Sequence, residues 1–125
     1  MEAKAAVAKI QPIPWSSIQP EAMSPLISRQ YISGEHLTMA RFELKKGSAV
    51  PEHKHANEQI CSVVSGSLVF RMDSREITVR AGEFLVIPPN VPHAAEARED
   101  CVAIDVFSPP RADWAAKEDG YLRGK

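Results

Sequence analysis

Short apolar runs separated by turn residues fill most of this chain, and this feature limits its fold more than any other. Glycine ends several of the runs, as at Ser33-Gly34, Lys46-Gly47 and Ser65-Gly66. Runs of this length and spacing are typical of antiparallel strands in a sandwich or barrel. The expected strands cover residues 29–32, 37–44, 50–55, 58–64, 67–72, 76–80, 83–87, 92–97 and 101–107. The pattern therefore predicts an all-β fold.

The chain length of 125 residues suits one domain, which can bury a core without disulfides. Residues 29–111 are expected to form the β-barrel domain. Residues 1–28 are rich in alanine and then in proline, and we expect an N-terminal arm, helical over Ala3 to Lys9, followed by an extended lead-in. Residues 112–125 read as a charged, partly disordered C-terminal tail. The termini are thus expected to be short and irregular or helical.

Charge and cysteine content exclude several classes of function. The net charge is −1 and the pI is about 6.4, which favours neither nucleic acid nor an anionic membrane as a partner. Cys61 and Cys101 fall in apolar runs, where reduced, buried thiols are expected rather than a disulfide. Residues 1–10 hold no continuous apolar segment, so we expect neither a signal peptide nor a membrane span, and by default a cytoplasmic location.

Three histidines and a glutamine lie in two stretches that are marked by glycines and prolines, residues 47–66 and 82–93, which we call the two frames. These four side chains are His53, His55, Gln59 and His93. A His-x-His pair alone is often two exposed strand residues without a ligand. Here glycines permit tight turns and prolines stiffen the loop before His93, so one metal ion held between two hairpins explains the whole arrangement. The remaining histidine, His36, lies in a turn and is expected to be solvated.

Strand parity places three of these four side chains on one face. Residues two apart on a strand share a face, and His53, His55 and Gln59 are all odd-numbered. If a tight connection at Ala56-Asn57 preserves the register, all three point inward and Glu58 points away.

The last expected strand divides in the same way. Cys101, Ala103, Asp105 and Phe107 share one face, which suits a polar cavity, and the opposite face carries the apolar set Val102, Ile104 and Val106. We expect that apolar set to pack between layers. A β-bulge would overturn this assignment.

The ligand types indicate one divalent transition metal ion. Imidazole suits Zn, Cu, Fe and Ni and tolerates Mn, whereas Gln59 offers only a neutral amide oxygen. The ion would keep its full charge and act as a strong Lewis acid. Because oxygen-activating iron sites use two histidines and a carboxylate, the glutamine favours polarising a carbonyl, a carboxylate or a water molecule instead.

These two frames resemble the two motifs of the cupin superfamily. The first matches completely in spacing, with Gln59 where the family has glutamate, and in the second Asn90 and Ala97 replace a glycine and an asparagine. The resemblance covers residues 30–107. It implies a double-stranded β-helix, or jelly-roll barrel, with a metal inside one mouth.

Three further runs resemble the single-domain cupins typified by the pectin-degradation protein KdgF. They begin at Ile13, His55 and Asp105, and the last runs to Arg111 as Asp-Val-Phe-Ser-Pro-Pro-Arg. The resemblance implies an enzyme that converts unsaturated uronate monomers into linear 5-keto-4-deoxyuronates. It also implies that three histidines and the glutamine hold the metal, and that Asp105, Phe107 and Arg111 act on the substrate.

Each implied catalytic residue has a chemical role and an alternative. Asp105 would move protons, Phe107 would lie against the sugar ring, and Arg111 would clamp a carboxylate in a bidentate pair. The alternatives are a structural strand carboxylate, an ordinary core ring and a surface arginine.

Two other functions stay open from the sequence. One is another metal-dependent cupin enzyme, such as a dioxygenase or a lyase, and the other is a metal-loaded cupin that binds a small molecule without turnover. The expected partner in each case is a small molecule, a sugar acid under the favoured hypothesis. A homodimer is also expected, because apolar strand faces can pair and the lead-in could add a strand to a partner's edge.

Overall fold

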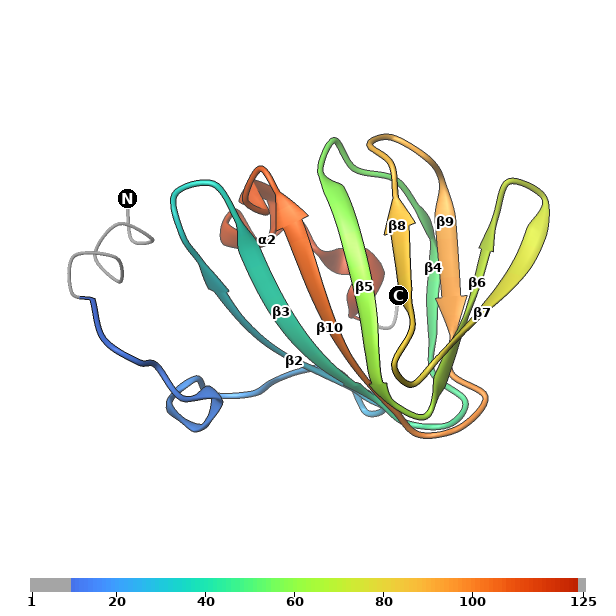
Figure 1. Cartoon of the computed structure of the whole chain (residues 1–125), viewed down its shortest axis with the longest axis horizontal. Coiled ribbons are helices and arrows are strands. Elements are labelled where there is room, and N and C mark those ends of the chain that lie inside the picture. The colour runs from blue at the N-terminus through green and yellow to red at the C-terminus, as the bar shows by residue number, and fades with distance from the viewer. Residues whose placement is uncertain (1–9, 124–125) are drawn as a thin grey trace.

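Two antiparallel sheets form the body of the molecule and face each other (Figure 1). The computed structural model describes residues 10–123, so the helix expected at 3–9 lies outside the described residues. The six-stranded sheet has the order β1-β2-β3-β10-β5-β8, and the four-stranded sheet has the order β4-β9-β6-β7. The all-β jelly-roll prediction is confirmed.

The strands match the expected apolar runs closely. The six-stranded sheet contains β1 (Glu21–Ser24), β2 (Ile27–Ser33), β3 (Thr38–Leu44), β10 (Cys101–Ser108), β5 (Glu58–Ser65) and β8 (Phe84–Ile87). The four-stranded sheet contains β4 (Ala49–His53), β9 (His93–Glu96), β6 (Ser67–Met72) and β7 (Arg75–Arg80). Three short helices complete the described chain, namely η1 (Trp15–Ser17), α2 (Ala112–Ala115) and η2 (Gly120–Leu122). None of the helices among residues 10–123 is long and apolar enough to cross a membrane.

The glycines of the two frames occupy turns. Gly47, Gly66 and Gly82 have φ angles of 93°, 73° and 87°, a backbone conformation that residues with a side chain rarely adopt. At Gly66 a Cβ atom would also overlap the backbone carbonyl of Asp100. Glycine at position 66 therefore lets the β5–β6 turn lie against the loop before β10.

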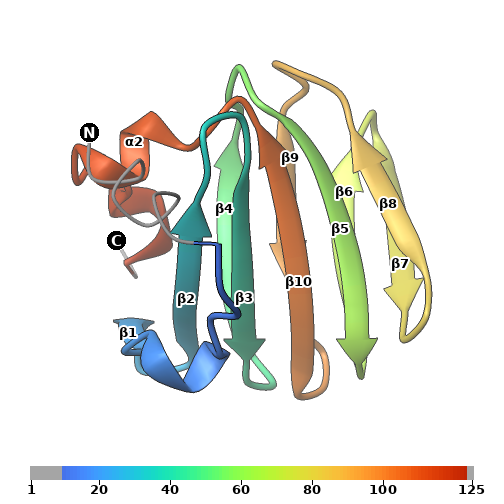
Figure 2. The same cartoon turned by 60° about the vertical axis from the view of Figure 1, so that its left-hand side comes forward.

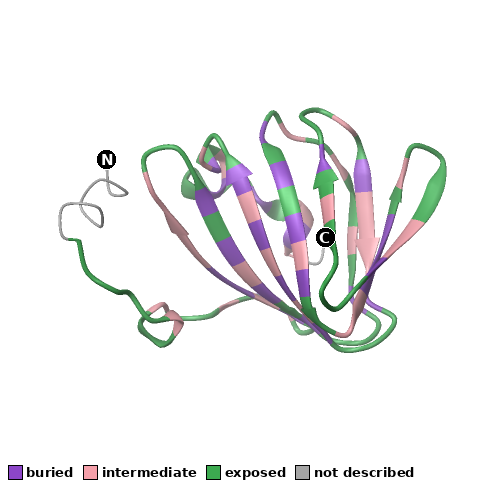
Figure 3. Cartoon of the chain, viewed as in Figure 1, coloured by how far each residue is buried: buried purple, intermediate pink, exposed green. Residues whose placement is uncertain are grey.

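Alternation along β10 separates an inner face from an outer face (Figure 3). Cys101, Ala103, Asp105 and Phe107 are all buried between the sheets, as parity predicted. Val102, Ile104 and Val106 are only half-buried, and the prediction that they pack between layers is wrong. The reason is that residues 10–123 form just two sheet layers, so the even-numbered face of β10 lies on the outside of the six-stranded sheet.

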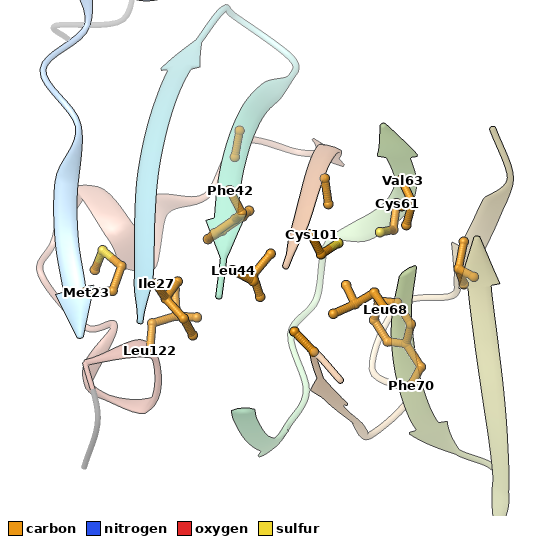
Figure 4. Packing of buried hydrophobic residues seen from close by; sticks show 14 of the residues in the cluster. Met23, Ile27, Phe42, Leu44, Cys61, Val63, Leu68, Phe70, Cys101 and Leu122 are labelled. Carbon is orange, nitrogen blue, oxygen red and sulfur yellow. The ribbon is translucent and has the colours of Figure 1, made fainter. Parts of the chain in front are cut away.

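Buried apolar side chains from both sheets fill the space between them (Figure 4). Phe42 and Leu44 come from β3, and Leu68 and Phe70 come from β6 of the opposing sheet. Cys61 and Cys101 are buried free thiols, so the expectation of reduced cysteines is confirmed.

Strand pairing begins before residue 29. β1, which lies between Pro20 and Pro25, pairs antiparallel with β2 at the edge of the six-stranded sheet. The Gln30 side chain also donates hydrogen bonds to the backbone carbonyls of Trp15 and Ile18, at 2.8 and 2.9 Å, which attach the lead-in to β2. A four-residue edge strand has too few residues to show an alternating pattern in the sequence.

The C-terminal segment is folded onto the barrel. α2 lies at the β1–β2 end of the six-stranded sheet, and η2 packs against β4 of the other sheet (Figure 2). Trp114 and Leu122 are buried, with 2% and 5% of their surface exposed. Residues 112–123 thus cover the seam between the two sheets, which is the gap between the β1–β2 end of the six-stranded sheet and β4 of the four-stranded sheet.

Candidate metal centre

Three histidines from two strands and a connecting loop converge at one place. His53 ends β4, His93 begins β9, and the two are cross-strand partners. Their ring centroids lie 4.3 Å apart, and the ring of His55 lies 5.1 Å from that of His93. One nitrogen from each of the three rings lies within 4.8 Å of the others, which is a geometry that can hold a metal ion.

His55 reaches the cluster from outside any strand. β4 ends at His53 rather than at the expected residue 55, so strand parity does not explain the position of His55. The loop after it is tied to the segment that follows β10, because the Asn57 amide donates to the backbone carbonyl of Pro110 at 3.2 Å. His36, in contrast, has a side chain that is 83% exposed, as expected for a solvated residue.

Backbone carbonyls orient all three rings. Nδ1 of His53 contacts the Pro51 carbonyl at 2.8 Å, and Nδ1 of His93 contacts the Val91 carbonyl at 2.8 Å. Nδ1 of His55 contacts the Asn57 carbonyl at 3.0 Å. A carbonyl only accepts, so each Nδ1 carries the hydrogen and each Nε2 keeps a lone pair. This is the tautomer that a metal requires, with the second nitrogen fixed by the protein.

Gln59 completes the donor set. Its amide nitrogen donates to Asp105 Oδ2 at 3.3 Å, which turns its Oε1 toward His55 Nε2 at 3.1 Å. Two acceptor atoms that face each other at this distance repel unless a cation lies beside both. His93 Nε2 is also buried without a hydrogen-bond partner among residues 10–123. These four side chains therefore fit a bound cation, whereas the neighbouring Glu58 is exposed.

Burial keeps the three imidazoles neutral. It lowers the pKa of His53 to about 4, and the nearby His93 and Arg111 act in the same direction against the Pro51 hydrogen bond. Burial also lowers the pKa values of His55 and His93. Neutral imidazole is the form that binds metal, so at neutral pH the three rings can bind an ion without first losing a proton.

Asp105 lies beside this cluster on the inner face of β10. Its side chain is buried, and Oδ1 has no hydrogen-bond partner among the described residues. Burial raises the pKa of Asp105 to about 6, against a hydrogen bond with Cys61 and the charge of Arg111. A carboxyl group that titrates near neutrality and has a free oxygen is suited to taking up and returning a proton.

Phe107 and Arg111 lie next along the same wall. The Phe107 ring meets His55 edge to face, with centroids 5.7 Å apart, and the Arg111 guanidinium lies 4.7 Å above the Phe107 ring. Arg111 is 3% exposed, so it is not the surface arginine that the sequence left open. Its Nε and Nη2 donate to both oxygens of Asp113, at 2.9 and 2.6 Å, which occupies one edge of the guanidinium.

A cavity of about 60 Å³ lies between the sheets and is lined by His53, Gln59, His93, Asp105, Phe107 and Arg111 together with core residues. This volume has room for about four water molecules and is less than half of the roughly 150 Å³ in which benzene binds inside an engineered apolar cavity. A sugar ring would therefore be only partly enclosed unless lining side chains shift.

A model of the cupin domain matches residues 40–107, which is more than half of the chain. The chain belongs to the cupin family. This cupin is also similar to the pectin degradation protein KdgF of Dickeya dadantii (strain 3937). The two sequences are 30% identical over 104 residues, which cover 81% of this chain and 90% of the relative.

Solved structures agree with the sequence relationship. The structure of KdgF from Halomonas sp. is similar to this cupin with a TM-score of 0.78 at 25% identity, covering 85% of this chain and 99% of the other. An RmlC-like cupin from Shewanella frigidimarina NCIMB 400 is similar with a TM-score of 0.77 at 25% identity, covering 85% and 96% of the two chains.

Sequence reasoning missed two aromatic residues of this cupin's cavity. Trp114 and Tyr121 line it from the C-terminal segment, beyond the part that the family model matches. Two guanidinium groups lie over the Trp114 indole, with the central carbons of Arg29 and Arg111 each 4.4 Å from the ring centroid. The available signal was the presence of a tryptophan and a tyrosine in an otherwise charged tail, because large aromatic rings are usually buried.

Proposed function

We propose that this cupin is a metal-dependent enzyme that opens the ring of 4,5-unsaturated uronate monomers and forms linear 5-keto-4-deoxyuronates. The observation that carries the proposal is the shared hydrogen bond between Gln59, in the metal donor set, and the buried Asp105 carboxylate. It joins a site for a cation to a group that can move protons. The similarity to KdgF, whose name refers to pectin degradation, supports a uronate as the substrate.

His53, His55, Gln59 and His93 would hold one divalent transition metal ion, which can be Ni, Zn, Mn, Fe or Cu. When bound, such an ion acts as a Lewis acid that attracts the oxygen atoms of a sugar acid. The donor set carries no negative charge of its own.

Asp105 is the proposed proton carrier. Its ionised carboxylate takes the proton of the anomeric hydroxyl group through the unpartnered Oδ1, and the bond between C1 and the ring oxygen breaks as the aldehyde forms. The former ring oxygen leaves as the enolate of C5. Return of the proton from Asp105 to C4 then converts C5 into a ketone, so the reaction is an isomerisation with no net gain or loss of protons.

Phe107 and Arg111 are proposed to position the substrate. The Phe107 ring offers an apolar surface to a sugar ring. Because Asp113 already holds the Nε and Nη2 side of Arg111, the substrate carboxylate would meet the two remaining hydrogens on Nη1. This arrangement differs from the bidentate clamp that the sequence suggested, although the buried positive charge still favours an acidic ligand.

An ultraviolet assay tests the function directly. The metal-loaded protein is incubated with unsaturated uronate released by a pectin or alginate lyase, and absorbance of the conjugated alkene should decay faster than in buffer. Elemental analysis confirms bound metal in the same sample. A decay rate equal to that in buffer, with metal present, would overturn the proposed reaction.

We also propose that this cupin forms a homodimer through the outer face of the six-stranded sheet. Met39, Val106, Ile60 and Val86 form one apolar row across four neighbouring strands. Phe84 lies beside this row and is 69% exposed. A continuous apolar row on an outer sheet face is suited to covering by a second copy of the chain.

A further inference from the structure

Tyr121 places a phenol in the wall of the cavity. It belongs to η2, and its ring stacks on the ring of His53, with centroids 4.4 Å apart and an interplanar angle of 26°. The family model ends at residue 107, so nothing in the cupin motifs accounts for this residue.

Two donors meet the phenol oxygen. Arg111 Nη2 lies 2.6 Å from Tyr121 Oη, and the indole nitrogen of Trp114 lies 3.2 Å from it. A guanidinium and an indole can only donate, so the phenol oxygen accepts both hydrogen bonds. The hydroxyl hydrogen of Tyr121 is then free, and no hydrogen bond within residues 10–123 uses it. Because Tyr121 lines the cavity, that hydrogen is available to a ligand there.

Ion pairs hold η2 in place. Asp119 immediately precedes η2, is 1% exposed, and pairs with Arg29 at 3.0 Å and with Arg123 at 2.9 Å. Arg123 follows η2 and also pairs with Glu21 of β1 at 2.8 Å. The phenol is therefore positioned before any ligand arrives, which lowers the entropic cost of using it in binding.

We propose that Tyr121 is a substrate-binding residue whose hydroxyl group donates a hydrogen bond to an oxygen atom of an acidic sugar in the cavity. The inference rests on the proposed function, since it assumes that a uronate occupies this cavity. Arg111 Nη1 and the Tyr121 hydroxyl would together offer two neighbouring donors to the ligand. The C-terminal segment of this cupin would then contribute to specificity as well as to the closure of the seam.

The test compares two variants that each lose one hydroxyl group. Tyr121→Phe keeps the ring on His53 and removes the donor. Tyr31→Phe is the matched control, because Tyr31 also lies against Trp114, with centroids 5.2 Å apart, but does not line the cavity. Calorimetry measures the dissociation constant of each metal-loaded protein for glucuronate, a saturated uronate without the alkene, and turnover of unsaturated uronate is followed in parallel.

We expect Tyr121→Phe to bind glucuronate about fivefold to tenfold more weakly than the wild type, as for the loss of one hydrogen bond. Its metal content should be unchanged, and Tyr31→Phe should bind like the wild type. Equal binding by Tyr121→Phe and the wild type would overturn the role of Tyr121 while the proposed function stands. An equal loss in Tyr31→Phe, or loss of metal from Tyr121→Phe, would assign the effect to packing and also overturn it. A wild-type protein that neither binds glucuronate nor turns over unsaturated uronate would overturn the proposed function and this inference together.

Discussion

Gln59 and Asp105 share one hydrogen bond, in which the Gln59 amide nitrogen donates to Asp105 Oδ2 at 3.3 Å. The amide can do this only by turning its oxygen toward His55, so a single side chain orients a donor atom for a cation and contacts the carboxylate proposed to move protons. A glutamate at position 59, the residue usual in the family motif, could not donate to Asp105 unless it were protonated.

This relationship predicts the effect of Gln59→Glu. The new carboxylate would lie beside Asp105, and repulsion between like charges would raise the pKa of Asp105 above its present value of about 6. We expect tighter metal binding, because the donor set gains a negative charge, and turnover that requires a higher pH than in the wild type. Metal titration and a pH–rate profile measure the two effects. A pH–rate profile that coincides with that of the wild type would contradict the proposed coupling.

Removing the charge of Asp105 tests its role separately. Asp105→Asn keeps the size of the side chain and leaves an acceptor oxygen for Gln59, so the fold and the metal content should be preserved. Turnover of unsaturated uronate should fall about 10²- to 10⁴-fold, the range typical of losing a general acid–base group. Steady-state kinetics with metal analysis measure this. Turnover within about threefold of the wild type would identify Asp105 as a structural carboxylate.

The stability of the metal-free protein should depend on pH through the three clustered histidines. The folded-state pKa of His53 is about 4, below the ordinary value of 6.5, and those of His55 and His93 are also lowered. Between these values each of the three histidines binds more protons in the unfolded chain than in the folded chain, so the histidines lower the free energy of unfolding as pH drops from about 6.5 toward 4. Asp105, whose folded-state pKa is raised to about 6, acts in the opposite direction.

Urea denaturation of the metal-free protein at several pH values measures this dependence. His53→Gln should show a shallower decrease, because one of the titrating groups is gone. His36→Gln is the control and should behave like the wild type, since His36 is exposed. Identical pH dependences for His53→Gln and the wild type between about pH 6.5 and 4 would contradict the prediction.

The proposed dimer predicts a change in molecular mass on substitution of Phe84. Phe84→Asp would place a charge on the outer face of the six-stranded sheet, where desolvating it opposes association. We expect the variant to be a monomer, whereas Leu26→Asp, a control in the β1–β2 turn, should remain a dimer. Light scattering after gel filtration distinguishes the two states. Identical masses for wild type and Phe84→Asp would argue against this interface.

Much of the candidate site could be predicted because the positions of its residues follow from patterns between neighbours in the sequence. Parity placed Gln59 and Asp105 on inner faces, and the structure buries both, with 6% and 7% of their surface exposed. The same reasoning was wrong about Val102, Ile104 and Val106, which lie on the outside of a two-layer fold. Parity separates the two faces of a strand, but which layers cover each face depends on the rest of the molecule.

The strands other than β1, the glycine-bearing turns between them and the set of donors that could meet at a metal could all be predicted from the sequence, because alternation and turn chemistry act between neighbouring residues. The placement of the C-terminal segment, in contrast, is visible only in the folded molecule. Its position depends on contacts between groups far apart in the chain, such as Asp119 with Arg29 and Trp114 with Arg29. No local periodicity encodes such contacts, so the entry of Tyr121 into the cavity wall appears only when the chain is folded.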